Sequence, residues 1–132
     1  MYTMKEVCDT IGISYETLRF YCNEGLVPNV KRDKNNYREF DERNISWLKS
    51  LQCLRKSGMS LKDMKLYMQL CMKGQSTIGE RKIMLNKQKH ILLQKMEDIN
   101  ECIAFIDHKL EFYAGVENEE IAYTSNLIQI DE

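Results

Sequence analysis

An apolar residue recurs every seven positions between residues 78 and 113, and this repeat constrains the fold more than any other feature of the chain. A heptad repeat of this length is typical of a coiled-coil helix, because one thin helix cannot bury such a stripe by itself. The rest of the chain predicts only short helices, so we expect the partner helix to come from a second copy. Lys82 and Lys89 make the seam half-polar at its start. The residues expected at the dimer seam are Ile78, Leu85, Leu92, Met96, Ile99, Ile103, Ile106, Leu110 and Tyr113.

Short polar residues that can cap a helix stand before each predicted helix. Two of them, Thr3 and Thr77, precede a glutamate by three residues, which is the capping-box pattern. Ser14, Asp41 and Ser60 stand before the other three helical segments. We therefore expect five helices, beginning near residues 4, 15, 42, 61 and 78.

The first two predicted helices are joined by a tight turn at Gly12, which makes them a helix-turn-helix candidate. Gly25 and Pro28 end the second helix, and residues 30–40 then place strand-forming residues on both sides of a turn-rich Asp-Lys-Asn-Asn sequence. This pattern predicts a small two-stranded wing that is basic on one side. The expected fold is mainly helical: a winged helix-turn-helix head over residues 1–73, a long dimerising coiled-coil helix over residues 74–115, and a tail over residues 116–132.

Charge is distributed unevenly along the chain. Residues 1–73 hold 13 lysines and arginines against 9 acidic residues, a net charge of +4, whereas residues 74–132 carry a net charge of -5. Such asymmetry is expected when one end of a protein meets phosphates and the other does not. Charge alone leaves open a merely uneven solvated surface.

Composition argues against several other classes of protein. No run approaches the 18 or so apolar residues of a membrane-spanning helix, and the first ten residues do not form a basic-then-apolar leader. We therefore expect a cytoplasmic protein without a membrane partner. The five cysteines are widely spaced and form no Cys-x-x-Cys pair, which argues against a disulfide scaffold and a structural zinc site. We expect no metal and no cofactor.

Several short motifs follow one another along the chain: Thr-Leu-Arg-Phe-Tyr at 17–21, Gly-Leu-Val-Pro at 25–28, Asn-Tyr-Arg at 36–38, Phe-Asp at 40–41 and Leu-Arg-Lys-Ser-Gly-Met-Ser-Leu at 54–61. Their order and spacing resemble the MerR family of bacterial transcriptional regulators, and the likeness extends from residue 2 to about residue 113. Two positions depart from the family pattern: Cys22 stands where an acidic residue is usual, and Phe20 replaces a commoner Tyr or His. We expect these departures to affect DNA contacts and to leave the fold unchanged.

The exposed face at the start of the second helix is expected to read DNA bases, because a recognition helix reads with its amino-terminal side. Tyr15 and Arg19 share this face at i and i+4, with Glu16 beside them. The arginine can donate two hydrogen bonds to guanine, and the glutamate can accept one from a cytosine amino group. The family resemblance implies that Tyr21, Tyr37 and Arg38 touch phosphates, and Lys31, Arg32 and Lys62 should add attraction that is independent of sequence. The expected DNA-binding residues are Tyr15, Glu16, Thr17, Arg19, Tyr21, Lys31, Arg32, Tyr37, Arg38 and Lys62.

The resemblance also implies a mechanism for the whole molecule. A homodimer would bind a near-palindromic promoter site in double-stranded DNA and untwist an overlong spacer, so that RNA polymerase, an indirect partner, engages both promoter elements. We expect no enzyme and no catalytic residues, since His90 and His108 are the only histidines and both lie on the coiled coil, away from a thiol they could activate. A coiled-coil adaptor that does not bind DNA is a distant alternative, and the basic wing argues against it.

The cysteines are the candidate sensing residues. Cys8 and Cys71 lie on apolar stripes and are expected in the core, whereas Cys53 has Lys49 at i-4 and Lys56 at i+3, which should favour the reactive thiolate. The sequence around Cys53 also resembles the aldehyde- and electrophile-responsive branch of the family, in which a lone thiol at this place is alkylated or oxidised. We therefore expect redox or electrophile sensing by Cys53.

Other effectors remain open. No cysteine follows Cys102, which disfavours the metal sensing of related proteins. Only nineteen residues follow Tyr113, which disfavours a large drug-type effector domain. The alternatives are an ordinary packed Cys53 with an unidentified small ligand as the effector, a Cys53–Cys102 redox pair, and a role for Cys22.

Overall fold

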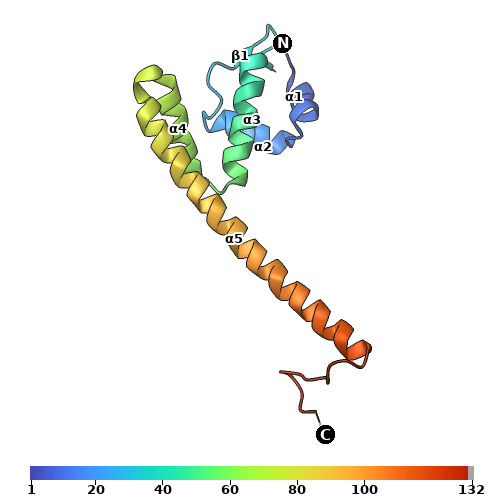
Figure 1. The fold of residues 1–132 in the computed structure, drawn as a ribbon. Helices are drawn as coiled ribbons and strands as arrows, with labels where there is room; N and C mark the ends of the chain where they lie inside the picture. Colours follow the sequence, from blue (N-terminus) through green and yellow to red (C-terminus); the bar gives the residue numbers. More distant parts are fainter. Residues whose placement is uncertain (131–132) are drawn as a thin grey trace. The chain divides into compact units, whose positions relative to one another are not determined.

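The computed structural model describes residues 1–130, and the chain forms two compact units, the first being Met1–Ile91 and the second beginning at Leu92. Figure 1 follows the elements from blue to red along the chain. All five α-helices begin at the predicted positions. The elements are α1 (Met4–Ile11), α2 (Tyr15–Asn23), β1 (Lys31–Arg32), β2 (Arg38–Glu39), α3 (Glu42–Lys56), α4 (Leu61–Met72), the short 3-10 helix η1 (Gln75–Thr77) and α5 (Ile78–Glu117).

The first four helices begin at the capping residues that the sequence indicates. Thr3 forms a complete capping box with Glu6, and Asp41 forms one with Asn44. The hydroxyl of Ser14 accepts a hydrogen bond from the backbone N–H of Thr17, and Ser60 caps α4 in the same way. Each cap satisfies an amide proton that the helix itself leaves unpaired.

The prediction of a capping box at Thr77 is wrong. The 3-10 helix η1 runs directly into α5, so Thr77 lies inside a continuous helical path. Its buried hydroxyl donates to the carbonyl oxygens of Leu70 and Gly74 and accepts a hydrogen bond from Arg81 Nε. Thr77 therefore joins the end of α4 to the start of α5 and does not cap a free helix end.

The core of the first unit forms where α1, α2 and α3 pack together, with residues from the wing and from α4. The amino terminus and β1 lie beside the start of α3 (Figure 1), where the Tyr2 hydroxyl donates to Glu42 Oε1. Leu18 of α2 is fully buried. The buried core residues are Val7, Ile13, Leu18, Tyr21, Leu26, Val27, Phe40, Ile45, Leu48, Leu51, Leu54, Met59 and Met64.

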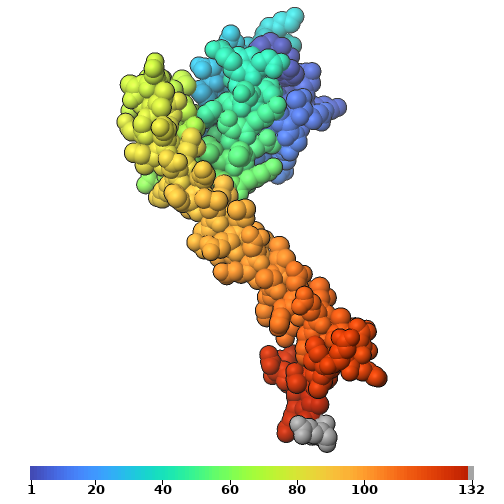
Figure 2. Space-filling view, in the orientation of Figure 1, coloured from blue at the N-terminus to red at the C-terminus, as the bar shows by residue number. Residues whose placement is uncertain are grey.

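The wing is a two-stranded antiparallel ribbon, as predicted, in which Lys31 pairs with Glu39 and Arg32 with Arg38. Its turn is closed by the Asp33 carboxylate, which accepts hydrogen bonds from the backbone N–H groups of Asn35 and Tyr37. In Figure 2 this turn, coloured cyan, stands out from the surface of the head.

Helix α5 contributes to the first unit at its beginning. Gln88 is buried, and its Nε2 donates to the carbonyl oxygen of Ser57 at 2.6 Å. This carbonyl lies at the C-cap of α3. The hydrogen bond therefore holds the first part of α5 against the end of α3.

In the second unit, α5 continues through Gly115 and ends at Glu117. Gly115 is buried, and its carbonyl oxygen accepts hydrogen bonds from the N–H groups of Glu120 and Ile121. Ile121 packs so closely that a Cβ on Gly115 would lie 2.4 Å from Ile121 Cδ1. Gly115 therefore permits the turn that leads into the tail.

Within residues 1–130, none of the helices contains an apolar stretch of the length that a membrane span requires.

Candidate DNA-binding interface

The outer face of α2 presents the predicted base-reading residues to solvent. Tyr15, Glu16 and Arg19 are exposed, whereas Leu18 faces the core. Thr17 is half-buried, and its hydroxyl oxygen accepts a hydrogen bond from Ser14 Oγ at 2.8 Å, so it helps to fix the start of the helix. The residues expected to read bases thus lie together on one surface.

Tyr21, which is expected to touch a phosphate, is buried on the side of α2 that faces the core. Its side chain is only 1% exposed, and its hydroxyl oxygen accepts a hydrogen bond from Arg55 Nη1 at 3.4 Å. The ring is therefore part of the core, and Tyr21 also borders a shallow groove between α2 and α3. Arg55, which the sequence did not single out, is exposed beside it.

The wing presents its cations in two ways. Lys31 and Arg32 are exposed, and Arg32 Nη1 donates to the Asn36 carbonyl oxygen at 2.8 Å within the wing turn. Arg38 is half-buried, and its Nη2 donates to Asn23 Oδ1 at 2.8 Å. Because Asn23 is the last residue of α2, this hydrogen bond links the wing directly to the end of that helix.

A hollow of about 400 Å³ lies between the start of the chain, the first residue of α2 and the wing; we call it the wing hollow. It brings together Tyr15, Tyr37 and Arg38, which the sequence predicted, and Tyr37 is 70% exposed at its edge. It also includes Lys5, which sequence reasoning missed. The signal was weak, because Lys5 stands among the polar residues of the first turn of α1.

Lys62 does not line the wing hollow. It lies in the first turn of α4, exposed, where it borders a separate shallow groove together with Lys65 and Leu66. Lys65 is engaged in an ion pair with Glu24, with 2.7 Å between Nζ and Oε2. Lys62 is therefore the more available cation of the two for a phosphate.

The predicted seam of α5 is exposed along its whole length. All nine seam residues have solvent-accessible side chains in the single chain, and Leu110 is 61% exposed. Phe105, on another face of the helix, is also exposed, with Lys109 Nζ 5.8 Å from its ring centroid. An apolar stripe of this length on one helix needs a cover that the single chain does not supply.

The cysteines divide by exposure. Cys53 on α3 and Cys102 on α5 are exposed, whereas Cys8, Cys22 and Cys71 are half-buried. Burial raises the pKa of the Cys22 thiol above its ordinary value, and the nearby guanidinium groups of Arg38 and Arg32 oppose this shift. Burial and the carboxylate of Asp9 raise the pKa of Cys8.

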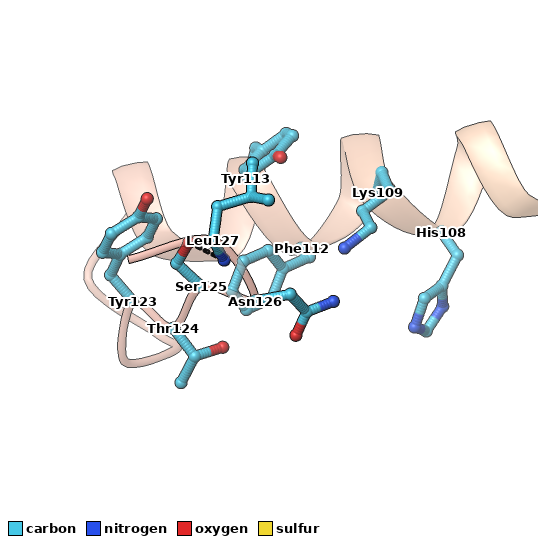
Figure 3. Close-up of a pocket in the computed structure, with 9 residues that line it drawn as sticks. All are labelled: His108, Lys109, Phe112, Tyr113, Tyr123, Thr124, Ser125, Asn126 and Leu127. Carbon is cyan, nitrogen blue, oxygen red and sulfur yellow. Dashed lines mark hydrogen bonds between the residues drawn. The ribbon is translucent and has the colours of Figure 1, made fainter. Parts of the chain in front are cut away.

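A cleft of about 340 Å³ lies in the second unit, between the last turns of α5 and the tail that folds back beside them. Figure 3 shows the tail, with Tyr123 to Leu127, running beside the helix turns that carry His108, Lys109, Phe112 and Tyr113. The Ser125 hydroxyl already accepts hydrogen bonds from the N–H groups of Leu127 and Ile128. The residues described here contain no group of three or more His, Cys, Asp or Glu side chains that could hold a metal ion.

A helix-turn-helix followed by a two-stranded wing, with an exposed polar face on its second helix, defines a winged helix-turn-helix protein. The sequence of residues 2–71 matches the model of the MerR HTH family of regulatory proteins. The chain belongs to the MerR family.

Similar proteins agree with this assignment. An uncharacterized HTH-type transcriptional regulator of Haemophilus influenzae is 37% identical over 99% of this chain and 97% of its own length. The regulator AdhR of Bacillus subtilis is 34% identical over 67% of this chain and 64% of its own length. Both are transcriptional regulators, a class of protein that is not enzymatic.

Solved structures resemble the fold over most of the chain. The crystal structure of HiNmlR, a MerR family regulator lacking the sensor domain and bound to promoter DNA, has a TM-score of 0.82 and 38% identity and covers 89% of each chain. A putative MerR family regulator from Listeria monocytogenes has a TM-score of 0.80 and 26% identity over 86% of each chain.

Proposed function

We propose that this protein is a transcriptional regulator that binds a near-palindromic promoter site in double-stranded DNA, in the cytoplasm. The observation that carries the proposal is the exposed face of α2, which holds Tyr15, Glu16 and Arg19. Tyr15 also lines the wing hollow together with Arg38 of the wing. Phosphate contacts from the wing position the protein, and base contacts from α2 choose the site. The likeness to HiNmlR, which was crystallised with promoter DNA, supports the same use of this surface.

A gel shift tests this function directly. The purified protein should bind a duplex from the promoter of its own operon more tightly than a random duplex of equal length, and its affinity should fall steeply with added salt. Equal affinity for both duplexes would refute sequence-specific regulation, and absence of binding at low salt would favour the coiled-coil adaptor.

We propose further that two copies pair through α5. The exposed seam supplies the apolar surface, and the charge along the helix favours an antiparallel arrangement. Residues 78–95 carry five basic residues and one acidic residue, whereas residues 96–117 carry one basic and six acidic residues. Antiparallel pairing places the basic half of one helix against the acidic half of the other, while parallel pairing would place like charges together. Sedimentation should give a dimer at micromolar concentration.

The dimer is proposed to act by distorting the promoter, as the family resemblance implies. Two heads that bind separated half-sites can bend or untwist the DNA between them. The free-energy cost of this deformation depends on the DNA sequence. RNA polymerase would then engage both promoter elements without a direct contact with this protein. Permanganate reactivity of spacer thymines should rise when the activating form binds, and an unchanged pattern would argue against distortion.

Modification of Cys53 is proposed as the switch. The exposure of the thiol on α3 supports this proposal, because Lys49 and Lys56 lie one helical turn before and after it in the sequence. In the proposed step, the thiolate sulfur adds to an electrophilic carbon, forming a carbon–sulfur bond, and the displaced electron pair takes a proton from water. The partial similarity to AdhR is consistent with this branch of the family.

Substitution of the two exposed thiols tests the switch. Cys53→Ser should abolish induction by an electrophile such as formaldehyde while leaving DNA binding intact, and Cys102→Ser is the matched control that should retain induction. Loss of induction in both variants would favour a Cys53–Cys102 redox pair. Full induction of Cys53→Ser would favour an unidentified small ligand with a structural Cys53.

A further inference from the structure

We infer that Asn23 is a positioning residue for DNA binding: it holds the Arg38 guanidinium of the wing beside the recognition helix while leaving its positive charge available to a phosphate. This inference rests on the proposed DNA-binding function. The observation behind it is the hydrogen bond from Arg38 Nη2 to Asn23 Oδ1, which is 2.8 Å long and joins residues fifteen positions apart.

The wing needs such a connection, because it is very small. Each strand has two residues, and an isolated two-stranded ribbon is at best marginally stable in water. The bridge between Tyr2 and Phe40 fixes the end of the wing that enters α3. The hydrogen bond from Arg38 to Asn23 fixes the wing against the other neighbour, the end of α2. The distance between the base-reading face and the wing cation is therefore set by this side-chain pair.

The groups around Arg38 decide how much of its charge remains. The neighbouring residue on α2, Cys22, carries a thiol that burial keeps in its neutral form, and Asn23 is a neutral amide. Asp33 and Glu39 line the same wing hollow, yet Arg38 forms no ion pair within residues 1–130. A carboxylate at position 23 would hold the guanidinium equally well and would cancel its charge. An amide orients the arginine without competing with the phosphate.

The pair is tested by measuring the affinity of the full-length protein for its promoter duplex at several salt concentrations. Arg38→Ala should weaken binding and reduce the slope of log affinity against log salt by about one, because one phosphate contact is lost. Asn23→Ala should weaken binding by about three- to tenfold, through the lost charge-assisted hydrogen bond. In the Arg38→Ala background, the same Asn23→Ala change should cost nothing further, which distinguishes positioning from a general structural role.

Asn23→Asp provides a second variant, which keeps a hydrogen-bond acceptor at the same position. It tests the inference even if the Asn23→Ala variant fails to fold. It should reduce the salt slope by about one, because the carboxylate neutralises Arg38. Asn118→Ala, at an exposed asparagine just after α5, is the matched control and should bind like the unchanged protein.

Several results would overturn the inference. Among them are wild-type affinity of Asn23→Ala or Asn23→Asp, and a loss in Asn23→Ala that persists in the Arg38→Ala background. If Arg38→Ala has no effect while the unchanged protein binds DNA, the inference fails and the proposed function stands. If the unchanged protein does not bind any duplex, the proposed function itself fails.

Discussion

At the scale of the residue, exposure and partners decide which cations are available to DNA. Arg19 is exposed on α2, whereas Arg32 and Arg38 each donate to a neighbouring oxygen of the protein. Lys65 is paired with Glu24, and Lys62 in the same helix makes no ion pair among the described residues. Arginines and lysines of this surface therefore differ in their availability to DNA, because some of them are already bonded to oxygen atoms of the protein.

Arg19→Ala and Lys62→Ala should weaken DNA binding in different ways. Loss of the Arg19 guanidinium should reduce discrimination between the cognate and a mismatched duplex by about 1–3 kcal/mol, because a two-bond contact to a base disappears. Lys62→Ala should weaken binding to all duplexes alike and lower the salt slope by about one. Fluorescence anisotropy on both duplexes checks this. Lys87→Ala, on the exposed surface of α5, is the control, and unchanged discrimination in Arg19→Ala would contradict base reading by that residue.

Cys22 should react slowly with alkylating agents in the folded protein. Its pKa is raised by burial, with partial opposition from Arg38 and Arg32, so the thiol remains protonated at neutral pH. Mass spectrometry after a short pulse of iodoacetamide should find Cys53 and Cys102 labelled before Cys22. In urea the difference should vanish. Labelling of Cys22 as fast as Cys53 under native conditions would show that burial does not protect it.

At the scale of the element, helix ends carry several of the interactions that the sequence signals. The Asp41 carboxylate at the start of α3 accepts hydrogen bonds from the backbone N–H of Asn44 and from Arg43 Nη2. Mainly through the Asn44 bond, the pKa of Asp41 lies below its usual value of 3.8. This stabilisation is present above the pKa of the unfolded chain and is lost as pH falls through the lower pKa of the folded state.

Asp41→Asn should therefore flatten the acid side of the stability profile. Asparagine also caps helices well but does not titrate. The melting temperature of the unchanged protein should fall as pH drops below about 4, and the fall should be less steep in the variant. Asp63→Asn in α4 serves as a matched control for the loss of one carboxylate. Parallel profiles of Asp41→Asn and the unchanged protein would exclude a contribution from this cap.

Gly115→Ala should release the tail from the end of α5. Alanine favours the helix, but its Cβ would lie 2.4 Å from Ile121 Cδ1, so Ile121 has to move. Limited proteolysis should cut the residues after Glu117 faster, with helix content by circular dichroism unchanged. Gly79→Ala, at a glycine of the same helix with open space around it, should leave the cleavage rate unchanged. Equal cleavage in both variants would show that Ile121 is not essential for the turn.

At the scale of the whole molecule, the exposed seam and the charge gradient of α5 are the features that the proposed dimer would use. Within the acidic half of α5, residues 96–117, Lys109 is the one basic residue. In the proposed dimer, a second copy in the opposite direction would supply both the apolar cover and the complementary charge. The direction in which the two helices pair would set the distance between the two heads. It would therefore also set the distance between the two DNA segments that the heads can contact.

The double substitution Lys82→Glu and Lys89→Glu distinguishes the two directions. In an antiparallel dimer these positions face the acidic half of the partner, so the substitution should raise the dissociation constant. In a parallel dimer it would relieve repulsion between basic halves and lower that constant. Sedimentation equilibrium measures the change. Lys87→Glu on the outer face of α5 is the control, and tighter association of the double variant would refute the antiparallel arrangement.

The sequence by itself determined the elements. The starts of the first four helices followed from capping residues, the wing from turn residues and the heptad seam from apolar spacing, because these features act over a few neighbouring positions. The start of α5 was predicted correctly, although Thr77 does not form the capping box from which it was inferred. The exposed face of α2 was also predictable, because Tyr15 and Arg19 lie one helical turn apart on the same face. Leu18 lies on a different face of the helix and is buried.

Only the tertiary structure decided how distant residues meet. The burial of Tyr21, the entry of Lys5 into the wing hollow and the pairing of Arg38 with Asn23 depend on how α1, α2 and the wing pack. The same holds for Thr77, which bonds to the end of α4 and so does not cap α5. Local pattern fixes which face of a helix is apolar, but the partner of a polar side chain depends on packing between segments that are far apart in the chain.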